Sequence, residues 1–202
     1  MGTPEIGIAF QADKSPGRYG ELAAAAEAYR FDVVSVFADL LDQPPLPALL
    51  EMARTTSRVR LGAACLNPYT QHPYEIAGGL AALDATSDGR AYLGLARGAW
   101  LEAIGIEQHR PLDYLRDTAA IVRALLSGDD AGYAGAAYRL APGVRLRYPL
   151  PGRVPPIQFW LRRISPGCLL APRLPFISRR WASFRSRIES GSPLGLCSWR
   201  RA

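Results

Sequence analysis

Residues 59–100 have the sequence VRLGAACLNPYTQHPYEIAGGLAALDATSDGRAYLGLARGAW. Two short apolar runs, beginning at Val59 and Ala91, flank a segment after Pro73 whose apolar residues recur at three- and four-residue spacing, which indicates a helix. That helix is expected to end near Asp88-Gly89, a pair typical of a helix stop. The order of strand, helix and strand predicts a βαβ unit with parallel strands.

The same pattern extends outward along the chain. Apolar runs begin at Ile6, Val33, Val59 and Ala91, at intervals of 27, 26 and 32 residues. Further helices are predicted at about Tyr19 to Tyr29, about Pro47 to Thr56 and about Leu112 to Leu126. Repeated βα units at this interval predict an α/β fold with four parallel strands, adjacent in chain order and with helices on one side.

The pattern changes after Gly128. Residues Tyr133 to Leu140 and Val144 to Tyr148 favour an inserted hairpin or loop, and Val154 to Ile157 would open a fifth strand. The residues that follow combine repeated prolines with no period of 2 or 3.6. The sequence therefore predicts a first domain over 1–156 and a separate basic tail over 157–202 that is poorly ordered.

The positive charge of the chain lies in that tail. The whole chain has a net charge of +6, but residues 1–156 hold 15 Lys and Arg against 17 Asp and Glu, whereas residues 157–202 hold 9 Arg against Glu189 alone. Arginines without a helical stripe or a recognisable module are weak evidence for nucleic-acid binding. The tail composition resembles translation of a GC-rich gene in a wrong reading frame.

Other features bear on the compartment. Cys65, Cys168 and Cys197 match neither a disulfide framework nor a zinc site, which predicts reduced thiols. No secretory signal is visible at the start, and no stretch of about 18 uncharged apolar residues offers a membrane span. We therefore expect a cytoplasmic protein without membrane contact and without a metal site.

Functional residues are expected in the loops that follow the strands, because ligand sites of βα barrels lie at the carboxyl ends of the strands. Polar or small residues follow three of the predicted strands: Asp39 after the second, Asn67 and His72 after the third, Arg97 and Gly98 after the fourth. Asp39 either orients a ligand or caps a turn. Asn67 either binds a heterocycle or initiates a turn, and His72 either exchanges a proton or caps the next helix.

Residues 59–100 resemble the luciferase-like monooxygenase superfamily, and most closely its deazaflavin-dependent branch related to methylenetetrahydromethanopterin reductase. The shared features are a third strand ending in Asn-Pro-Tyr-Thr-x-His-Pro, a Leu-Asp…Ser-x-Gly-Arg turn and a Leu-Gly-x-x-x-Gly fourth strand. The resemblance extends to about residue 156 and covers roughly three quarters of the chain. It implies the N-terminal half of a TIM (βα)8 barrel, which is incomplete because a whole barrel needs about 250 residues.

The resemblance also implies a cofactor and a site. The cofactor would be coenzyme F420 or FMN, bound with its ring at the strand ends and used in hydride transfer with a small-molecule substrate. In the family a bulge on the third strand, often with a non-prolyl cis peptide, supports the ring, and Ala64 and Cys65 occupy the matching positions. By itself Cys65 favours a small buried residue over a nucleophile.

Three departures limit what the resemblance implies about catalysis. Ala64 replaces a frequent glycine, and Leu40 and Ala99 stand where some relatives have a histidine and an acidic residue. Only Asp39 and His72 then remain as weak catalytic candidates. We expect an oxidoreductase impaired by truncation, with weak cofactor binding and no turnover. The alternative is a non-catalytic half-barrel remnant that associates through an exposed strand edge.

Overall fold

The computed structural model of the chain describes residues 5–150 and 152–159. Its centre is a five-stranded parallel sheet in the order β1-β2-β3-β4-β7. The strands are β1 Gly7–Phe10, β2 Val33–Val36, β3 Arg60–Leu66, β4 Ala91–Leu95 and β7 Ile157–Phe159. The prediction of four parallel strands, adjacent in chain order, is confirmed.

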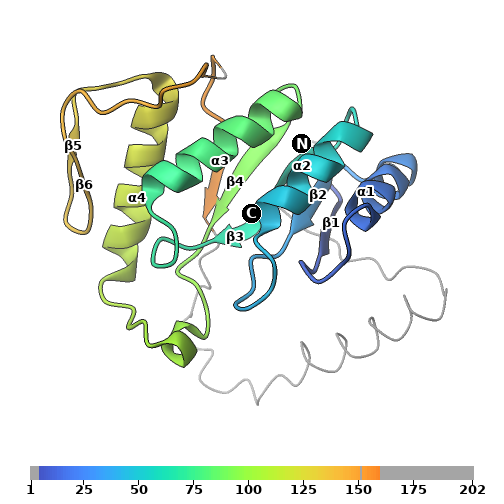
Figure 1. Cartoon of the computed structure of the whole chain (residues 1–202), viewed down its shortest axis with the longest axis horizontal. Helices are drawn as coiled ribbons and strands as arrows, with labels where there is room; N and C mark the ends of the chain where they lie inside the picture. The colour runs from blue at the N-terminus through green and yellow to red at the C-terminus, as the bar shows by residue number, and fades with distance from the viewer. Residues whose placement is uncertain (1–4, 151, 160–202) are drawn as a thin grey trace.

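Four helices connect or flank these strands: α1 Arg18–Ala28, α2 Pro45–Thr55, α3 Pro73–Thr86 and α4 Pro111–Ser127. They lie over one face of the sheet (Figure 1), as the sequence predicts. The second helix begins at Pro45, two residues before the predicted start at Pro47. Both prolines fit the first turn because backbone N–H groups there have no partner within the helix.

The hydrophobic core lies between the sheet and the helices. Alternate strand residues, such as Val34, Leu61 and Leu93, are buried in one cluster with helix residues such as Met52 and Ile76. This burial holds the strands in register and aligns their carboxyl ends along one edge of the sheet.

The opposite face of the sheet, which would line a barrel, is packed by a polar pair. The hydroxyl groups of Tyr92 and Ser35 are 2.6 Å apart, and both side chains are buried. Gly62 lies between them, and a Cβ at this glycine would be 2.6 Å from a carbon of the Tyr92 ring. Burial raises the pKa of Tyr92 to about 12, so its phenol stays protonated at neutral pH.

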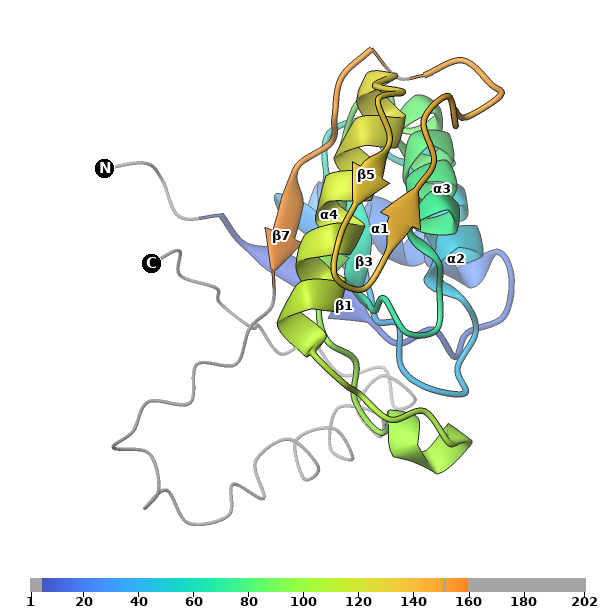
Figure 2. The ribbon, with the colours of Figure 1, turned by 90° about the vertical axis from the view of Figure 1, so that its left-hand side faces the viewer.

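The segment between α4 and β7 contains the predicted hairpin. Strands β5 Tyr133–Ala134 and β6 Arg139–Leu140 pair antiparallel and lie along α4 (Figure 2). Residues 144–148 form no strand.

The sequence predicts that the fifth strand starts at Val154, but β7 begins at Ile157. Pro155 and Pro156 have no N–H group to donate to a neighbouring strand, which explains the later start. The carbonyl of Pro156 nevertheless accepts a hydrogen bond from Leu93 N at 2.9 Å. The predicted boundary after residue 156 remains a prediction, and residues 160–202 of the expected tail lie outside the described residues.

Candidate functional site

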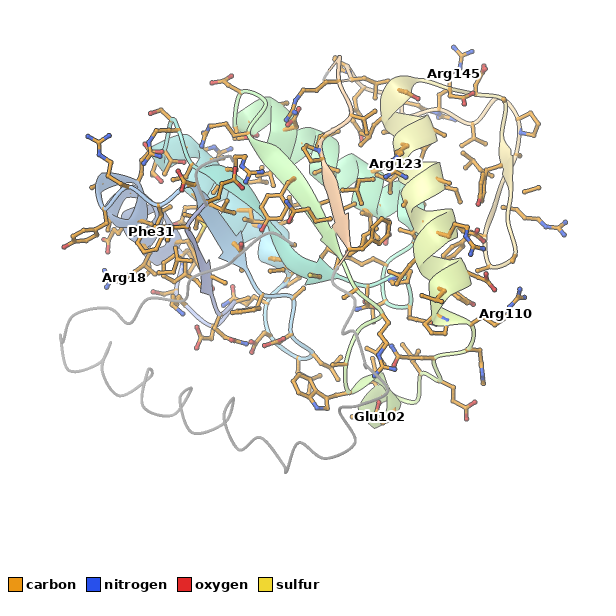
Figure 3. All side chains as sticks on the ribbon, turned by 180° about the vertical axis from the view of Figure 1, so that it is seen from behind. Arg18, Phe31, Glu102, Arg110, Arg123 and Arg145 are labelled. Atoms are coloured by element: carbon orange, nitrogen blue, oxygen red, sulfur yellow. The ribbon has the colours of Figure 1, made fainter. Side chains whose placement is uncertain are left out.

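The predicted site residues lie in loops at the carboxyl ends of β2, β3 and β4, which meet at one edge of the sheet. A longer excursion follows β4 and contains the 3₁₀ helix η1 Leu101–Ile104 before α4 starts. Glu102 and Arg110 mark this excursion at the same end of the molecule (Figure 3). The fold thus brings three separate loops of the sequence to a common region.

Strand β3 is irregular at the positions that the resemblance singled out. Its pairing with β4 shifts register between Ala63 and Leu66, and the peptide bond between Ala64 and Cys65 is cis. The predicted bulge and non-prolyl cis peptide are therefore confirmed. Cys65 is partly buried, and this burial raises the pKa of its thiol to about 12, which keeps the thiol protonated and argues against a nucleophile.

Asn67 and Gly98 come together across the ends of β3 and β4. Asn67 is only 9% exposed, and its Oδ1 accepts hydrogen bonds of 3.0 Å from the N–H groups of Tyr69 and Thr70. Gly98 has a φ of +86°, and a Cβ there would lie 3.1 Å from Asn67 Cβ. The prediction that Asn67 initiates a turn is thus confirmed, and the turn is held by its Oδ1. Its Nδ2 forms no hydrogen bond within the described part of the chain and remains a free donor.

Arg97 lies beside this pair, at the surface. Its guanidinium forms no ion pair or hydrogen bond with another described residue. Its backbone is held in place, because Gln108 Nε2 donates to the carbonyl oxygens of Arg97 and Gly98. The segment therefore presents a fixed backbone and a cationic side chain that is unpaired among the described residues.

Asp39 lies in the loop after β2 and has a different set of partners. Gln11, at the end of β1, donates through Nε2 to Oδ2 of Asp39 and to Oδ2 of Asp42, both at 2.6 Å. No hydrogen bond connects Asp39 with Asn67 or His72. The structure thus places Asp39 at the same end of the sheet without joining it to the other candidates.

His72 is the N-cap of α3, so its capping interpretation is confirmed. Its Nδ1 accepts a hydrogen bond of 3.3 Å from Tyr74 N. Its ring packs edge-on against Tyr138, with 5.0 Å between the ring centroids. The second nitrogen, Nε2, has no hydrogen bond among the described residues.

The Leu-Asp…Ser-x-Gly-Arg motif lies at the opposite end of the strands. The Arg90 guanidinium donates to the carbonyl oxygens of Ala53, Thr56, Val59 and Ser87. Asp84, which is 2% exposed, accepts from Arg153 and from Ala91 N. The motif therefore joins the start of β4 to neighbouring loops, and its role is structural.

Sequence reasoning missed two residues that shape the candidate site. Gln11 directly follows the first strand, so the rule that identified Asp39 would also have found it. Tyr138 donates through its hydroxyl to the carbonyl oxygen of Pro68 from 70 residues away. No local pattern indicates that contact.

Neither a metal site nor a membrane span is found in the part of the chain that the structure describes. No group of three or more His, Cys, Asp and Glu side chains there could hold a metal ion. None of the described helices is long and apolar enough to cross a membrane.

The fold and the loops define the class: a parallel βα half-barrel with small and polar residues gathered at the carboxyl ends of its strands. Residues 3–162 match the family of luciferase-like monooxygenases. The chain belongs to this family, as the resemblance implies.

Individual relatives agree with this assignment. The 5,10-methylenetetrahydromethanopterin reductase of Methanolobus tindarius is 30% identical over 126 residues, which are 61% of this chain and 39% of that protein. The coenzyme F420 dependent tetrahydromethanopterin reductase from Methanopyrus kandleri has a TM-score of 0.72 at 22% identity, over 78% of this chain and 50% of that chain.

A third relative comes from another reaction class. The oxygenating constituent of 3,6-diketocamphane monooxygenase from Pseudomonas putida, solved in complex with FMN, has a TM-score of 0.63 at 20% identity, over 78% of this chain and 52% of that chain. At this identity it shows the shared fold. The chain spans about half the length of the relatives it matches or less.

Proposed function

We propose that this chain carries the ring-binding half of a cofactor site in an oxidoreductase, with coenzyme F420 or FMN as the cofactor and a small molecule as the substrate, acting in the cytoplasm. The observation that carries the proposal is the meeting of the irregular strand end at Ala64 and Cys65 with Asn67 and Gly98 at one edge of the sheet. One solved relative is F420-dependent and another was solved with FMN.

The chemistry of these residues suits a flat heterocycle. Asn67 Nδ2, which no described residue engages, can donate to a ring nitrogen or carbonyl oxygen, and Gly98 lets the backbone after β4 pack against Asn67, where a Cβ would lie 3.1 Å from that side chain. Cys65 contributes a neutral thiol, and Arg97 contributes a positive charge that forms no ion pair with a described residue. When bound, the flavin or deazaflavin would supply the hydride chemistry.

Two titratable side chains are candidates for proton transfer. Asp39 keeps Oδ1 without a hydrogen bond from a described residue while Gln11 holds its Oδ2, and His72 keeps Nε2 while Nδ1 caps α3. A catalytic role for either predicts a loss of turnover, at retained cofactor affinity, in Asp39→Asn or His72→Gln. Because this chain alone is expected not to turn over, the rates are to be measured after the other half of the barrel has been supplied and the wild type is active.

The affinity of the 202-residue chain on its own is expected to be low. We propose that the cofactor phosphate is bound by the half of the barrel that has no match in this chain. Charge-assisted hydrogen bonds contribute about 1.5–3 kcal/mol each, so lacking two of them weakens binding by at least about a hundredfold. We expect weak binding of F420 or FMN and no turnover by this chain alone.

Fluorescence titration with F420 and with FMN, on monomeric folded protein, tests the proposal. Asn67→Ala should weaken the binding of at least one cofactor, because it removes the free Nδ2 donor. Gln43→Ala is the control, since Gln43 is an amide in the loop after β2 whose Nε2 donates to Lys14 O. Equal affinity of the wild type and Asn67→Ala for both cofactors would refute the site.

A second proposal concerns association. Within the described sheet, β1 and β7 each have a neighbour on one side only, so their outer edges carry unpaired N–H and C=O groups. We expect the chain to self-associate through such an edge. Sedimentation velocity over a range of concentrations measures this, and a monomer at every concentration contradicts it.

A further inference from the structure

The carboxylate of Asp117 on α4 binds the β5–β6 hairpin through hydrogen bonds. Asp117 is 2% exposed and accepts hydrogen bonds from Ala137 N at 2.6 Å, Tyr138 N at 3.1 Å and the Tyr133 hydroxyl at 2.8 Å. Gly135 allows this approach, because a Cβ there would lie 2.3 Å from the carboxylate. Burial raises the pKa of Asp117, but these hydrogen bonds outweigh it and leave the pKa lowered. The anchor is therefore ionised at neutral pH.

This anchor fixes Tyr138, the hairpin residue that reaches the candidate site. The Tyr138 hydroxyl donates to the carbonyl oxygen of Pro68, which directly follows Asn67. The Tyr138 ring also packs edge-on against His72 and against Tyr114 of α4, with centroid distances of 5.0 and 5.2 Å. Tyr138 thus contacts the loop after β3 near its start and at its last residue.

The same loop is held from α4 and from the segment before it. Tyr69 stacks on Tyr114 at 4.5 Å, and its hydroxyl donates to His109 O at 2.8 Å. The conformation that Tyr138 supports is the one in which Asn67 Oδ1 accepts from Tyr69 N and Thr70 N. In that conformation Oδ1 is occupied, and Nδ2 is the atom left for a ligand.

We infer that Tyr138 is a positioning residue for the cofactor site: it fixes the Asn67 loop from a hairpin that is itself anchored at Asp117. The inference rests on the proposed function for its consequence, because a correctly held Asn67 matters only if it binds the cofactor ring. Its structural part, the stabilisation of the loop, is measurable without any cofactor. A neutral hydrogen bond contributes little in net terms, so the expected effect is about three- to tenfold.

The test compares Tyr138→Phe with Tyr29→Phe. The first variant removes the hydroxyl that reaches Pro68 and keeps the ring contacts with His72 and Tyr114. Tyr29 is 71% exposed at the end of α1 and forms no side-chain hydrogen bond with a described residue, so it controls for loss of a hydroxyl. Hydrogen exchange is to be measured at the amides of Tyr69 and Thr70, together with the affinity for F420 and FMN.

We expect Tyr138→Phe to speed exchange at those two amides by about three- to tenfold and to weaken cofactor binding by a similar factor. Exchange in the core of β4, for example at Leu93, should stay unchanged in both variants. Unchanged exchange at Tyr69 and Thr70, or equal acceleration at Leu93, would overturn the inference. If the wild type binds neither cofactor, the proposed function fails and the exchange at the loop still decides the role of Tyr138.

Discussion

Gly98 combines a left-handed backbone conformation with a close contact to Asn67. Its φ of +86° is unfavourable for other residues, and an added Cβ would lie 3.0 Å from Leu101 Cδ1 and 3.1 Å from Asn67 Cγ. Gly98→Ala is therefore expected to lower the free energy of unfolding by about 1–3 kcal/mol and to weaken cofactor binding. Chemical denaturation and cofactor titration measure the two effects.

Gly105→Ala is the matched control for this change. Gly105 also has a positive φ, of +75°, but a Cβ there meets no atom within 4 Å. It should lower stability through the same backbone cost and leave cofactor affinity unchanged. If both variants lose affinity equally, the contact between Gly98 and Asn67 has no part in binding.

For single residues, the sequence predicted where the candidate site residues lie, but not which hydrogen bonds they form. The loops after β2, β3 and β4 contain Asp39, Asn67, His72, Arg97 and Gly98, as the strand-end rule indicates. Whether Asn67 holds a turn or a ligand remained open, because its side chain has both a donor and an acceptor. In the structure the acceptor Oδ1 holds the turn, which the sequence pattern alone does not determine.

At the scale of elements, the return of the chain to β7 depends on the ion pair between Asp84 and Arg153. Asp84 is buried on α3, and Arg153 Nε donates to its Oδ2 at 3.2 Å from the segment before β7. Asp84→Ala leaves the exposed Arg153 and the buried Ala91 N without this partner and should cost about 1–3 kcal/mol of stability in denaturant unfolding.

The exposed pair of Asp130 and Arg145 provides the comparison. Asp130→Ala should change the denaturation midpoint little, because solvent screens exposed ion pairs. An equal loss of stability in Asp84→Ala and Asp130→Ala would show that burial of the Asp84 pair contributes nothing.

The connection from α2 to β3 is expected to be pH-sensitive through Glu27 of α1. Burial alone would raise the pKa of Glu27, but hydrogen bonds from the N–H groups of Ser57, Arg58 and Val59 lower it from 4.5 to about 2. A depressed folded-state pKa contributes stability above about pH 4.5 that is lost as pH falls toward 2.

Glu27→Gln should therefore flatten the decline in the free energy of unfolding between about pH 4.5 and pH 2. Glu21→Gln on the exposed side of α1 should leave that decline as in the wild type. Urea unfolding at several pH values measures the slope, and identical slopes for the wild type and Glu27→Gln would contradict the assignment.

The sequence predicted the helices well, because their positions depend on local features of the chain. Helical spacing and proline or glycine boundaries predicted the ends of α1 to α4 within about two residues. The hairpin was expected only as a hairpin or loop, because its two short strands depend on Asp117, a buried carboxylate of another element. Contacts of that kind leave no periodic trace in the sequence.

At the scale of the whole molecule, the order of strands followed from a general rule. Right-handed βαβ crossovers place successive strands side by side, and the observed order β1-β2-β3-β4-β7 obeys it. Two long-range contacts complete the structure: Tyr138 reaches Pro68 across 70 residues at the candidate site, and Arg153 reaches Asp84 across 69 at the opposite end of the strands. Such pairs are decided by tertiary packing, which explains why the sequence did not reveal them.

The central claim is that the carboxyl ends of β3 and β4 bind the ring of a redox cofactor. The most direct measurement is a titration of the ¹⁵N-labelled chain with coenzyme F420 and with FMN, followed by amide chemical shifts. We expect saturable shifts at Tyr69, Thr70 and Gly98, with none at Gly89 and Arg90 at the opposite end of the strands. Shifts centred on Gly89 and Arg90, or none with either cofactor at millimolar concentration, would contradict the claim.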